Sequence, residues 1–249
     1  MTTLVFCHAH PDDEALLTAG TMARAAAEGH RVVLIVATDG AAGLTSARLR
    51  DGLADVRRAE VEQSARILGT ARVVHLGYTD SGLRGDAAGG MAGVPVEEVS
   101  ARIAEVAAEE GADVLVGYDA AGGYGHADHR VLHRATRRAA ARTRARLFEA
   151  TLPREPIASA VRLASLARVT PADFDPGEFA QAWTPRREIT HRVDVRAYLP
   201  AKRASLRAHA SQAEADGATR TLGVLAGLPA PAFGWLLGTE YYLRVPHHR

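Results

Sequence analysis

Residues 4–14 of the chain read LVFCHAHPDDE, in which a short apolar run ends abruptly in imidazole and carboxylate side chains. A second run, RVVLIVAT at residues 31–38, is apolar almost throughout, as strands buried on both faces of a parallel sheet are. Similar runs follow farther along the chain, at residues 72–76, 113–117 and 147–152. Segments of helical character separate these runs, at residues 13–28, 46–68, 96–109 and 128–144. The alternation predicts an α/β fold with a Rossmann-like, mostly parallel sheet covered by helices on both faces.

The chain after residue 152 has a less regular pattern, because prolines interrupt it repeatedly. One amphipathic helix and two strands are expected there, at residues 197–215, 188–195 and 241–245. No repeat and no linker divides the sequence, so we expect a single domain over residues 1–249. In this interpretation residues 1–152 form the core, and the C-terminal portion, residues 153–249, shapes a substrate pocket. Glycine-rich stretches at residues 82–93 and 120–125 are predicted to be binding loops.

The composition is that of a globular protein and excludes several classes of partner. Of 249 residues, 47% are hydrophobic and 24% charged, and 30 basic residues balance 29 acidic ones to a formal net charge of +1. That balance gives no electrostatic reason to bind nucleic acid or a membrane surface. The longest apolar run falls far short of the roughly 20 residues of a membrane span, and we find no signal-peptide pattern. A single cysteine, Cys7, excludes an internal disulfide framework, so we expect a cytoplasmic protein, with homo-oligomers left open.

The turn after the first predicted strand concentrates groups that bind metals and move protons. His10, Asp12, Asp13 and Glu14 lie within five residues, where the carboxyl end of a strand in an open parallel sheet meets ligands. A plainer interpretation is that the acidic residues only cap the following helix, whose first turn also suits Pro11. Capping needs one acidic residue rather than three and does not account for the histidine, so a functional site is favoured.

A second cluster, YDAAGGYGHADH at residues 118–129, follows the fourth predicted strand at the same edge of the sheet. His126 and His129 are three residues apart, so at the start of a helix they point to nearly the same side. Glycines before them allow the backbone to approach a ligand closely. Two strand ends that each combine histidine with aspartate therefore predict a joint metal site.

The chemistry of these residues indicates a catalytic metal site rather than a structural one. Two histidine nitrogens, one carboxylate and an open position are the usual ligands of catalytic zinc, whereas structural zinc favours closed, cysteine-rich sites. Fe²⁺ accepts the same ligands, so Zn²⁺ is the expected cofactor and Fe²⁺ the alternative. Such a metal lowers the pKa of water to about 7 and polarises a carbonyl. A carboxylate that is not a ligand can then serve as general base.

The motifs HPDDE at residues 10–14 and GHADH at residues 125–129 closely resemble those of the PIG-L/LmbE-like zinc-dependent N-deacetylase family. The resemblance continues through residues 38–40, 57–69, 80–82 and 202–212, and so covers nearly the whole chain. It implies a hydrolase that removes acetyl groups from conjugates of N-acetylglucosamine. The nearest group implied is that of the mycothiol deacetylases and the mycothiol S-conjugate amidases, whose substrates are small amino-sugar conjugates.

Carried onto this sequence, the resemblance implies that His10, Asp13 and His129 are the metal ligands. It implies that Asp12 is the base that takes a proton from the attacking water. His126, held by Asp128, would stabilise the oxyanion or protonate the departing amine.

The resemblance leaves four other assignments to be decided. Tyr124 could help to polarise the acetyl carbonyl, because its phenol is a suitable donor. The general acid is not evident, since the base could also return its proton to the amine nitrogen. Arg57 and Arg58 are adjacent candidates for a sugar-binding arginine, and we favour Arg57. Asp80 is the expected partner of sugar hydroxyls, although an aspartate before Ser81 and Gly82 could equally form a turn.

Several other functions remain as alternatives. The closest variants are an amidase that cleaves a larger acyl group from a glucosaminyl conjugate and a catalytically silent sugar-binding relative. A dinucleotide-dependent oxidoreductase is disfavoured, because the first turn lacks the G-x-G-x-x-G pattern and its acidic residues would repel a pyrophosphate. A metal phosphoesterase more often uses two metals. The loops at residues 82–93 and 153–187 are expected to select the aglycone.

Overall fold

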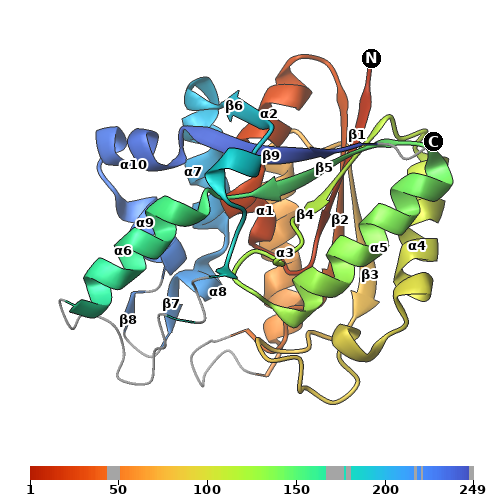
Figure 1. Cartoon of the computed structure of the whole chain (residues 1–249), viewed down its shortest axis with the longest axis horizontal. Helices are drawn as coiled ribbons and strands as arrows, with labels where there is room; N and C mark the ends of the chain where they lie inside the picture. Colours follow the sequence, from red (N-terminus) through yellow and green to blue (C-terminus); the bar gives the residue numbers. More distant parts are fainter. Residues whose placement is uncertain (44–50, 167–176, 178–180, 216–217, 220, 247–249) are drawn as a thin grey trace.

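The structure, a computed structural model, describes residues 1–43, 51–166, 177, 181–215, 218–219 and 221–246. Its centre is a seven-stranded sheet with the order β3-β2-β1-β4-β5-β9-β6 (Figure 1). The strands are β1 Thr3–His8, β2 Arg31–Thr38, β3 Arg72–Tyr78, β4 Val114–Tyr118, β5 Arg146–Thr151, β6 His191–Asp194 and β9 Thr239–Val245. The first five pair in parallel, whereas β9 and β6 add to the β5 edge in antiparallel orientation. The predicted mostly parallel sheet is confirmed.

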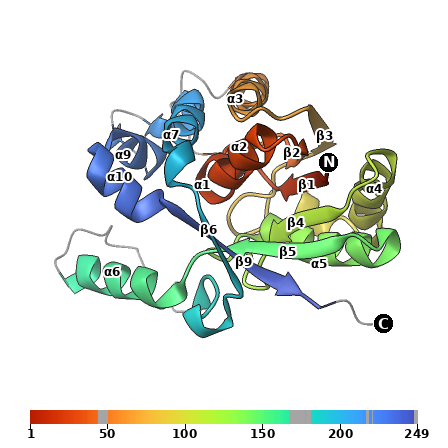
Figure 2. The same cartoon turned by 90° about the horizontal axis from the view of Figure 1, so that it is seen from above.

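Helices cover both faces of this sheet, as expected (Figure 2). One face carries α4 Val96–Glu109 and α5 Ala127–Thr143, and the other carries α2 Ala19–Ala27, α3 Leu53–Ile67 and α7 Leu199–Ala208. In α4 the side chains of Val99, Ile103 and Val106 are buried, at the spacing of one helix face. These helices bury the apolar strands, so β1 and β2 lie at the centre of the core.

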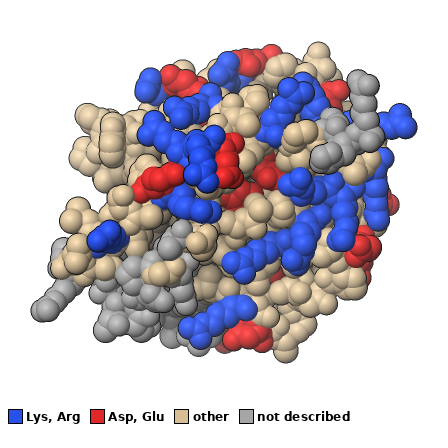
Figure 3. All heavy atoms as spheres, in the orientation of Figure 1, with Lys and Arg blue, Asp and Glu red and all other residues tan. Residues whose placement is uncertain are grey.

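The outer face of α5 is basic, which Figure 3 shows as arginine gathered over this part of the surface. Arg137 and Arg138 are exposed and pair with acidic neighbours, Glu149 at 2.9 Å and Glu97 at 3.2 Å. The arginine-rich stretch is therefore a solvated helix face, opposite the face that packs on the sheet. No helix within the described ranges has the length and hydropathy to cross a membrane.

The helix predicted at residues 13–28 is wrong in one respect, because the structure divides it into α1 Asp13–Leu17 and α2. Thr18 separates them with a non-helical φ of −134°. Its hydroxyl lies 2.8 Å from Nε2 of the buried His8, so a partner at the end of β1 stabilises the break. The helix expected at residues 46–68 begins only at Leu53 of α3, and residues 44–50 lie outside the described residues.

The C-terminal portion contains more helix than the sequence predicts. The expected helix at residues 197–215 is divided at His209, where α7 ends and the short α8 Ala210–Ala213 begins. The predicted strand at 188–195 is shortened to β6, and the strand at 241–245 is extended to β9. Further elements of this portion that were not predicted are α6 Arg154–Leu166, α9 Thr221–Gly227, α10 Ala230–Leu237, the paired β7 Glu214–Ala215 and β8 Ala218–Thr219, and the short helices η4 Arg186–Glu188 and η5 Arg196–Tyr198. Earlier in the chain, the short helix η2 Met91–Gly93 was not predicted either.

Candidate active site

The two histidine–aspartate clusters meet at the carboxyl edge of the parallel strands, where β1 and β4 are neighbours. His10 lies in the turn after β1, Asp13 is the first residue of α1, and His129 lies in the first turn of α5. Nδ1 of His10 lies 3.2 Å from Nε2 of His129, and Oδ2 of Asp13 lies 3.3 Å from each of these nitrogens. The three atoms thus form a nearly equilateral triangle, and all three side chains are buried.

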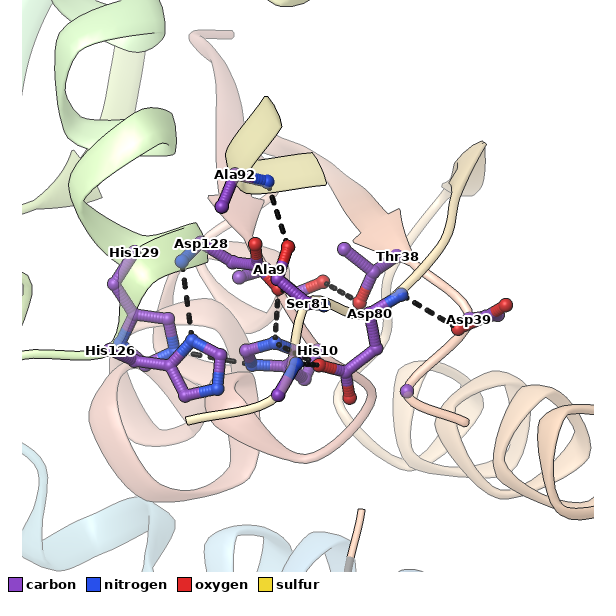
Figure 4. Close-up of polar contacts among 12 residues, drawn as sticks. Ala9, His10, Thr38, Asp39, Asp80, Ser81, Ala92, His126, Asp128 and His129 are labelled. Atoms are coloured by element: carbon purple, nitrogen blue, oxygen red, sulfur yellow. Dashed lines mark hydrogen bonds and ion pairs between the residues drawn. The ribbon is translucent and has the colours of Figure 1, made fainter. Parts of the chain in front are cut away.

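The second ring nitrogen of both His10 and His129 faces a hydrogen-bond acceptor, which Figure 4 shows for His10. Nε2 of His10 lies 3.2 Å from Oδ2 of Asp128 and 3.5 Å from Oδ1 of Asp80. Nδ1 of His129 lies 3.2 Å from the carbonyl oxygen of Gly122. Because these acceptors favour a proton on the outer nitrogen, they favour the tautomer in which the inner nitrogen of each ring can bind a metal once it is deprotonated.

This triangle fits a tetrahedral divalent cation. Ligand atoms about 2.0–2.1 Å from zinc lie about 3.3 Å apart at tetrahedral angles, which matches the observed spacing. His126 lies close enough to offer a third nitrogen, because suitable atoms of His10, His126 and His129 all fall within 4.8 Å of one another. His10, Asp80, His126 and Asp128 form a second such group. In the triangle with Asp13, all three distances are 3.2–3.3 Å.

Electrostatics couple the members of the triangle. Burial alone would lower the pKa of His10, but its contacts with Asp128, Asp13 and Asp80 raise the pKa well above its usual value. Burial would raise the pKa of Asp13, but His129 and His10 hold it well below its usual range. Asp13 is therefore a carboxylate at neutral pH, which is the form that binds a metal.

Tyr118, the last residue of β4, is a member of the site that sequence reasoning missed. Its hydroxyl donates to Oδ2 of Asp13 at 2.5 Å and accepts from the backbone N–H of Ala9 at 2.9 Å. Its ring stacks on that of His129 with centroids 4.1 Å apart. Tyr118 is fully buried and so fixes two corners of the triangle. The only signal in the sequence was a tyrosine at the end of an apolar strand.

Asp12 lies beside the triangle in a strained conformation, with φ at 136° and ψ at −21°. Such a conformation is rare for a residue other than glycine and indicates a functional constraint. Its carboxylate lies 3.0 Å from an Arg57 nitrogen, and its side chain keeps 17% exposure. Burial raises the pKa of Asp12; the Arg57 guanidinium opposes this shift and Asp13 adds to it.

Arg57, and not Arg58, reaches this site. Arg57 is buried and donates to the carbonyl oxygens of Gly40 at 2.7 Å and Pro11 at 2.6 Å. Its Nε has no hydrogen-bond partner within the described residues. Arg58 is exposed and pairs with Glu62 at 3.5 Å.

His126 caps the start of α5, where its Nδ1 accepts the backbone N–H of Asp128 at 3.2 Å. Asp128 therefore contacts His126 through its backbone rather than its side chain. The Asp128 carboxylate instead contacts His10 and the backbone N–H of Ser81, at 3.2 and 3.0 Å, because the helix start turns it toward β1 (Figure 4). Burial, followed by the nearby His10 and His129, lowers the pKa of His126 to about 4. His126 is thus a neutral imidazole at neutral pH.

Tyr124 and Asp80 border the same site. Tyr124 is 38% exposed, and its ring lies edge-on to those of His129 and His126, with centroids 5.2 and 6.0 Å away. Oδ1 of Asp80 accepts the backbone N–H of Gly82 at 2.8 Å, the contact that a turn-forming aspartate makes. Burial would raise the pKa of Asp80, but His10 outweighs it and lowers the pKa to about 2. Asp80 therefore both forms a turn and faces His10.

Comparison with known proteins identifies one family. Residues 5–140, more than half of the chain, match the family described as PIG-L: GlcNAc-PI de-N-acetylase. A 1D-myo-inositol 2-acetamido-2-deoxy-alpha-D-glucopyranoside deacetylase of Kineococcus radiotolerans is 35% identical over 269 residues, covering 92% of this chain and 74% of the relative.

Solved structures show the same fold. N,N'-diacetylchitobiose deacetylase from Pyrococcus horikoshii aligns with a TM-score of 0.60 and 21% identity over 98% of this chain and 82% of that one. The 4-carboxy-2-hydroxymuconate hydratase GalB from Pseudomonas putida aligns with a TM-score of 0.62 and 17% identity, over 100% of this chain and 98% of its own. The fold therefore serves more than one reaction, and the function depends on the residues of the site.

Proposed function

The chain belongs to the PIG-L family of GlcNAc-PI de-N-acetylases, and on that premise we propose that it removes the acetyl group from a small conjugate of N-acetylglucosamine. The reaction is hydrolysis of an amide C–N bond, which gives acetate and a free amine. The observation that carries this proposal is the triangle of His10 Nδ1, Asp13 Oδ2 and His129 Nε2, with atoms 3.2–3.3 Å apart beside an additional carboxylate.

We propose His10, Asp13 and His129 as the ligands of a Zn²⁺ ion, with Fe²⁺ as the alternative. When bound, the metal would polarise the acetyl carbonyl and lower the pKa of water to about 7. The carboxylate of Asp128, at 3.2 Å, would hold the ring of His10 in the orientation that the ligand role needs. The carbonyl of Gly122 would do the same for His129.

Asp12 is the general base in this proposal. Asp12 directly precedes the corner residue Asp13 without forming a corner itself, and its side chain retains 17% exposure, whereas the carboxylates of Asp80 and Asp128 face His10. Asp12 would accept a proton from the attacking water as that water adds to the acetyl carbon. The protonated Asp12 would then deliver this proton to the departing nitrogen, so that the amine leaves neutral.

His126 would stabilise the oxyanion. Because Nδ1 accepts the N–H of Asp128, the proton of a neutral ring sits on Nε2 and is free to donate. Tyr124, whose hydroxyl has no hydrogen bond within the described part of the chain, would be a second donor to the acetyl oxygen. Asp80 would contact sugar hydroxyls through its second carboxylate oxygen, and Arg57, beside Asp12, would be the sugar-binding arginine.

The experiment is an assay of amine and acetate release from N-acetylglucosaminyl inositol and from analogues with longer acyl groups. Purified wild-type chain loaded with one equivalent of Zn²⁺ should release one acetate per amine. An Asp12→Asn variant loaded in the same way is the matched control. Preference for a longer acyl group would identify the amidase variant instead. Metal binding without release from any acylated amino sugar would contradict catalysis and favour a sugar-binding role.

We also propose that the enzyme is cytoplasmic and acts on small molecules, without a nucleic-acid or membrane partner. The formal net charge of +1 supports the absence of a polyanionic partner. Association into homo-oligomers is measurable by light scattering of the purified chain.

A further inference from the structure

The peptide unit between Pro11 and Asp12 is held at both of its polar ends. Its carbonyl oxygen, on Pro11, accepts from a terminal nitrogen of Arg57 at 2.6 Å. Its N–H, on Asp12, donates to Oε2 of Glu14 at 3.1 Å. Because a peptide unit is planar, two contacts at opposite ends fix the orientation of the whole plane.

That orientation matters because Asp12 has its φ at 136°, a conformation that persists only where the surroundings impose it. Arg57 also contacts the Asp12 carboxylate, at 3.0 Å. Arg57 alone, however, holds only one end of the peptide unit. Rotation of the N–H end is opposed by the carboxylate of Glu14.

Glu14 is itself fixed from two distant parts of the chain. Its Oε1 accepts the hydroxyl of Ser64, on α3, at 2.6 Å, and lies 2.7 Å from Nε2 of His209. His209 stands at the break between α7 and α8, and all three side chains are fully buried. The hydroxyl of Ser205, on α7, lies 2.7 Å from that of Ser64. The Glu14 carboxylate therefore has little freedom to turn.

We propose that Glu14, fixed by His209 and Ser64, is a positioning residue that holds Asp12 in its strained conformation. This inference rests on the proposed function in so far as it treats Asp12 as the base. If Glu14 positions Asp12, the C-terminal portion of the chain contributes to catalysis, because His209, which holds Glu14, lies 195 residues after it in the sequence.

Glu14→Gln tests this arrangement directly. The amide offers only one acceptor oxygen, so its NH₂ group must face either the Asp12 N–H or the donors from Ser64 and His209. We expect kcat to fall by about 10- to 100-fold, because small displacements of a reacting group cost that much. KM and bound zinc should not change, since neither the triangle nor the sugar contacts are altered.

Glu240→Gln is the matched control. Glu240 is also a buried carboxylate, and it accepts the backbone N–H groups of Gly20 and Thr21, both at 2.8 Å, and the ammonium of Lys202. Glu240 is on β9, and its carboxylate contacts the first turn of α2 rather than the turn that holds Asp12. The Glu240→Gln variant should have a lower thermal stability than the wild type but no specific loss of kcat.

Variants of His209 separate positioning from general stability. His209→Leu removes the donor to Glu14 and should reduce kcat, whereas His209→Gln retains a donor and should restore most of it. Ser64→Ala removes the other donor to the same oxygen and replaces His209→Leu if that protein does not fold.

The crystal structure of Glu14→Gln decides the inference independently of turnover. We expect the φ of Asp12 to leave the positive region and its carboxylate to move from Arg57. An unchanged Asp12 backbone, with kcat no lower than in Glu240→Gln, would overturn the inference. A wild-type chain that releases no acetate would instead count against the proposed function, and the Asp12 conformation in the Glu14→Gln crystal would still decide the inference.

Discussion

Replacing Asp12 by Asn removes the proposed base with little change in shape. Asn tolerates a positive φ at least as well as Asp, so the observed φ of 136° can be kept. Arg57 retains its bonds to the carbonyl oxygens of Gly40 and Pro11. No corner of the triangle formed by His10, Asp13 and His129 is touched.

The expected effect on catalysis is large. General base assistance contributes about 10²–10⁴-fold, so kcat should fall by that factor, which corresponds to about 3–5 kcal/mol at 1.36 kcal/mol per tenfold change.

The same substitution should not lower the stability of the metal-free protein. Because the pKa of Asp12 is raised in the folded protein, its ionised form costs folding free energy at every pH above its usual value of 3.8. Metal-free Asp12→Asn should therefore be at least as stable as metal-free wild type at pH 7.

The assay combines steady-state release of amine, zinc content by elemental analysis, and chemical unfolding of the metal-free proteins at pH 4 and pH 7. The stability difference in favour of the variant should grow above pH 4 until the pH passes the raised pKa of folded Asp12, since the unfolded chain is already ionised there while the folded one still binds the proton. Nearly normal turnover by a zinc-loaded Asp12→Asn protein would refute the role of Asp12 as base. Loss of zinc from this variant would refute the assignment of the ligands.

Three further outcomes are expected. Asp13→Ala and His129→Ala should each lose bound zinc and activity together, and either variant that keeps one zinc per chain would contradict its ligand role. Cys7 is fully buried, and burial raises its pKa to about 12, so the thiol should resist thiol reagents in the native protein. Between pH 9 and 12 the free energy of unfolding should fall by about 1.4 kcal/mol per pH unit, because only the unfolded chain ionises Cys7 there, and Cys7→Ala should remove this slope. Gly20→Ala places a methyl group 2.5 Å from Cβ of buried Val195, so it should cost about 1–2 kcal/mol in unfolding free energy after the gain in helix propensity. Val195→Gly removes that Cβ, so Gly20→Ala should cost less in a Val195→Gly background than in the wild type.

The sheet core could be predicted closely from the sequence, because buried parallel strands must be apolar almost throughout. The expected strand at residues 31–38 is β2 itself, and the helix expected at residues 96–109 is α4 itself. The helix breaks at Thr18 and His209 could not be predicted. Each depends on a hydrogen bond to a residue from another element, His8 in one case and Glu14 in the other.

The site was predictable where the residue types themselves indicate the chemistry. His10, His126 and His129 do come together, and Asp12 and Asp13 lie beside them. The sequence could not indicate that the Asp128 carboxylate faces His10 rather than His126, because this depends on the direction of the first turn of α5. The roles of Tyr118 and Glu14 were missed for the same reason, since their partners lie about a hundred or more residues away.

The most direct test of the account is the metal content of the purified chain, measured together with amine release from N-acetylglucosaminyl inositol before and after chelation. The account predicts about one zinc or iron per chain, release of amine and acetate in equal amounts, and loss of this activity on chelation with recovery when Zn²⁺ is restored. A chain that holds no stoichiometric metal and deacetylates equally well after chelation would contradict the metal site formed by His10, Asp13 and His129.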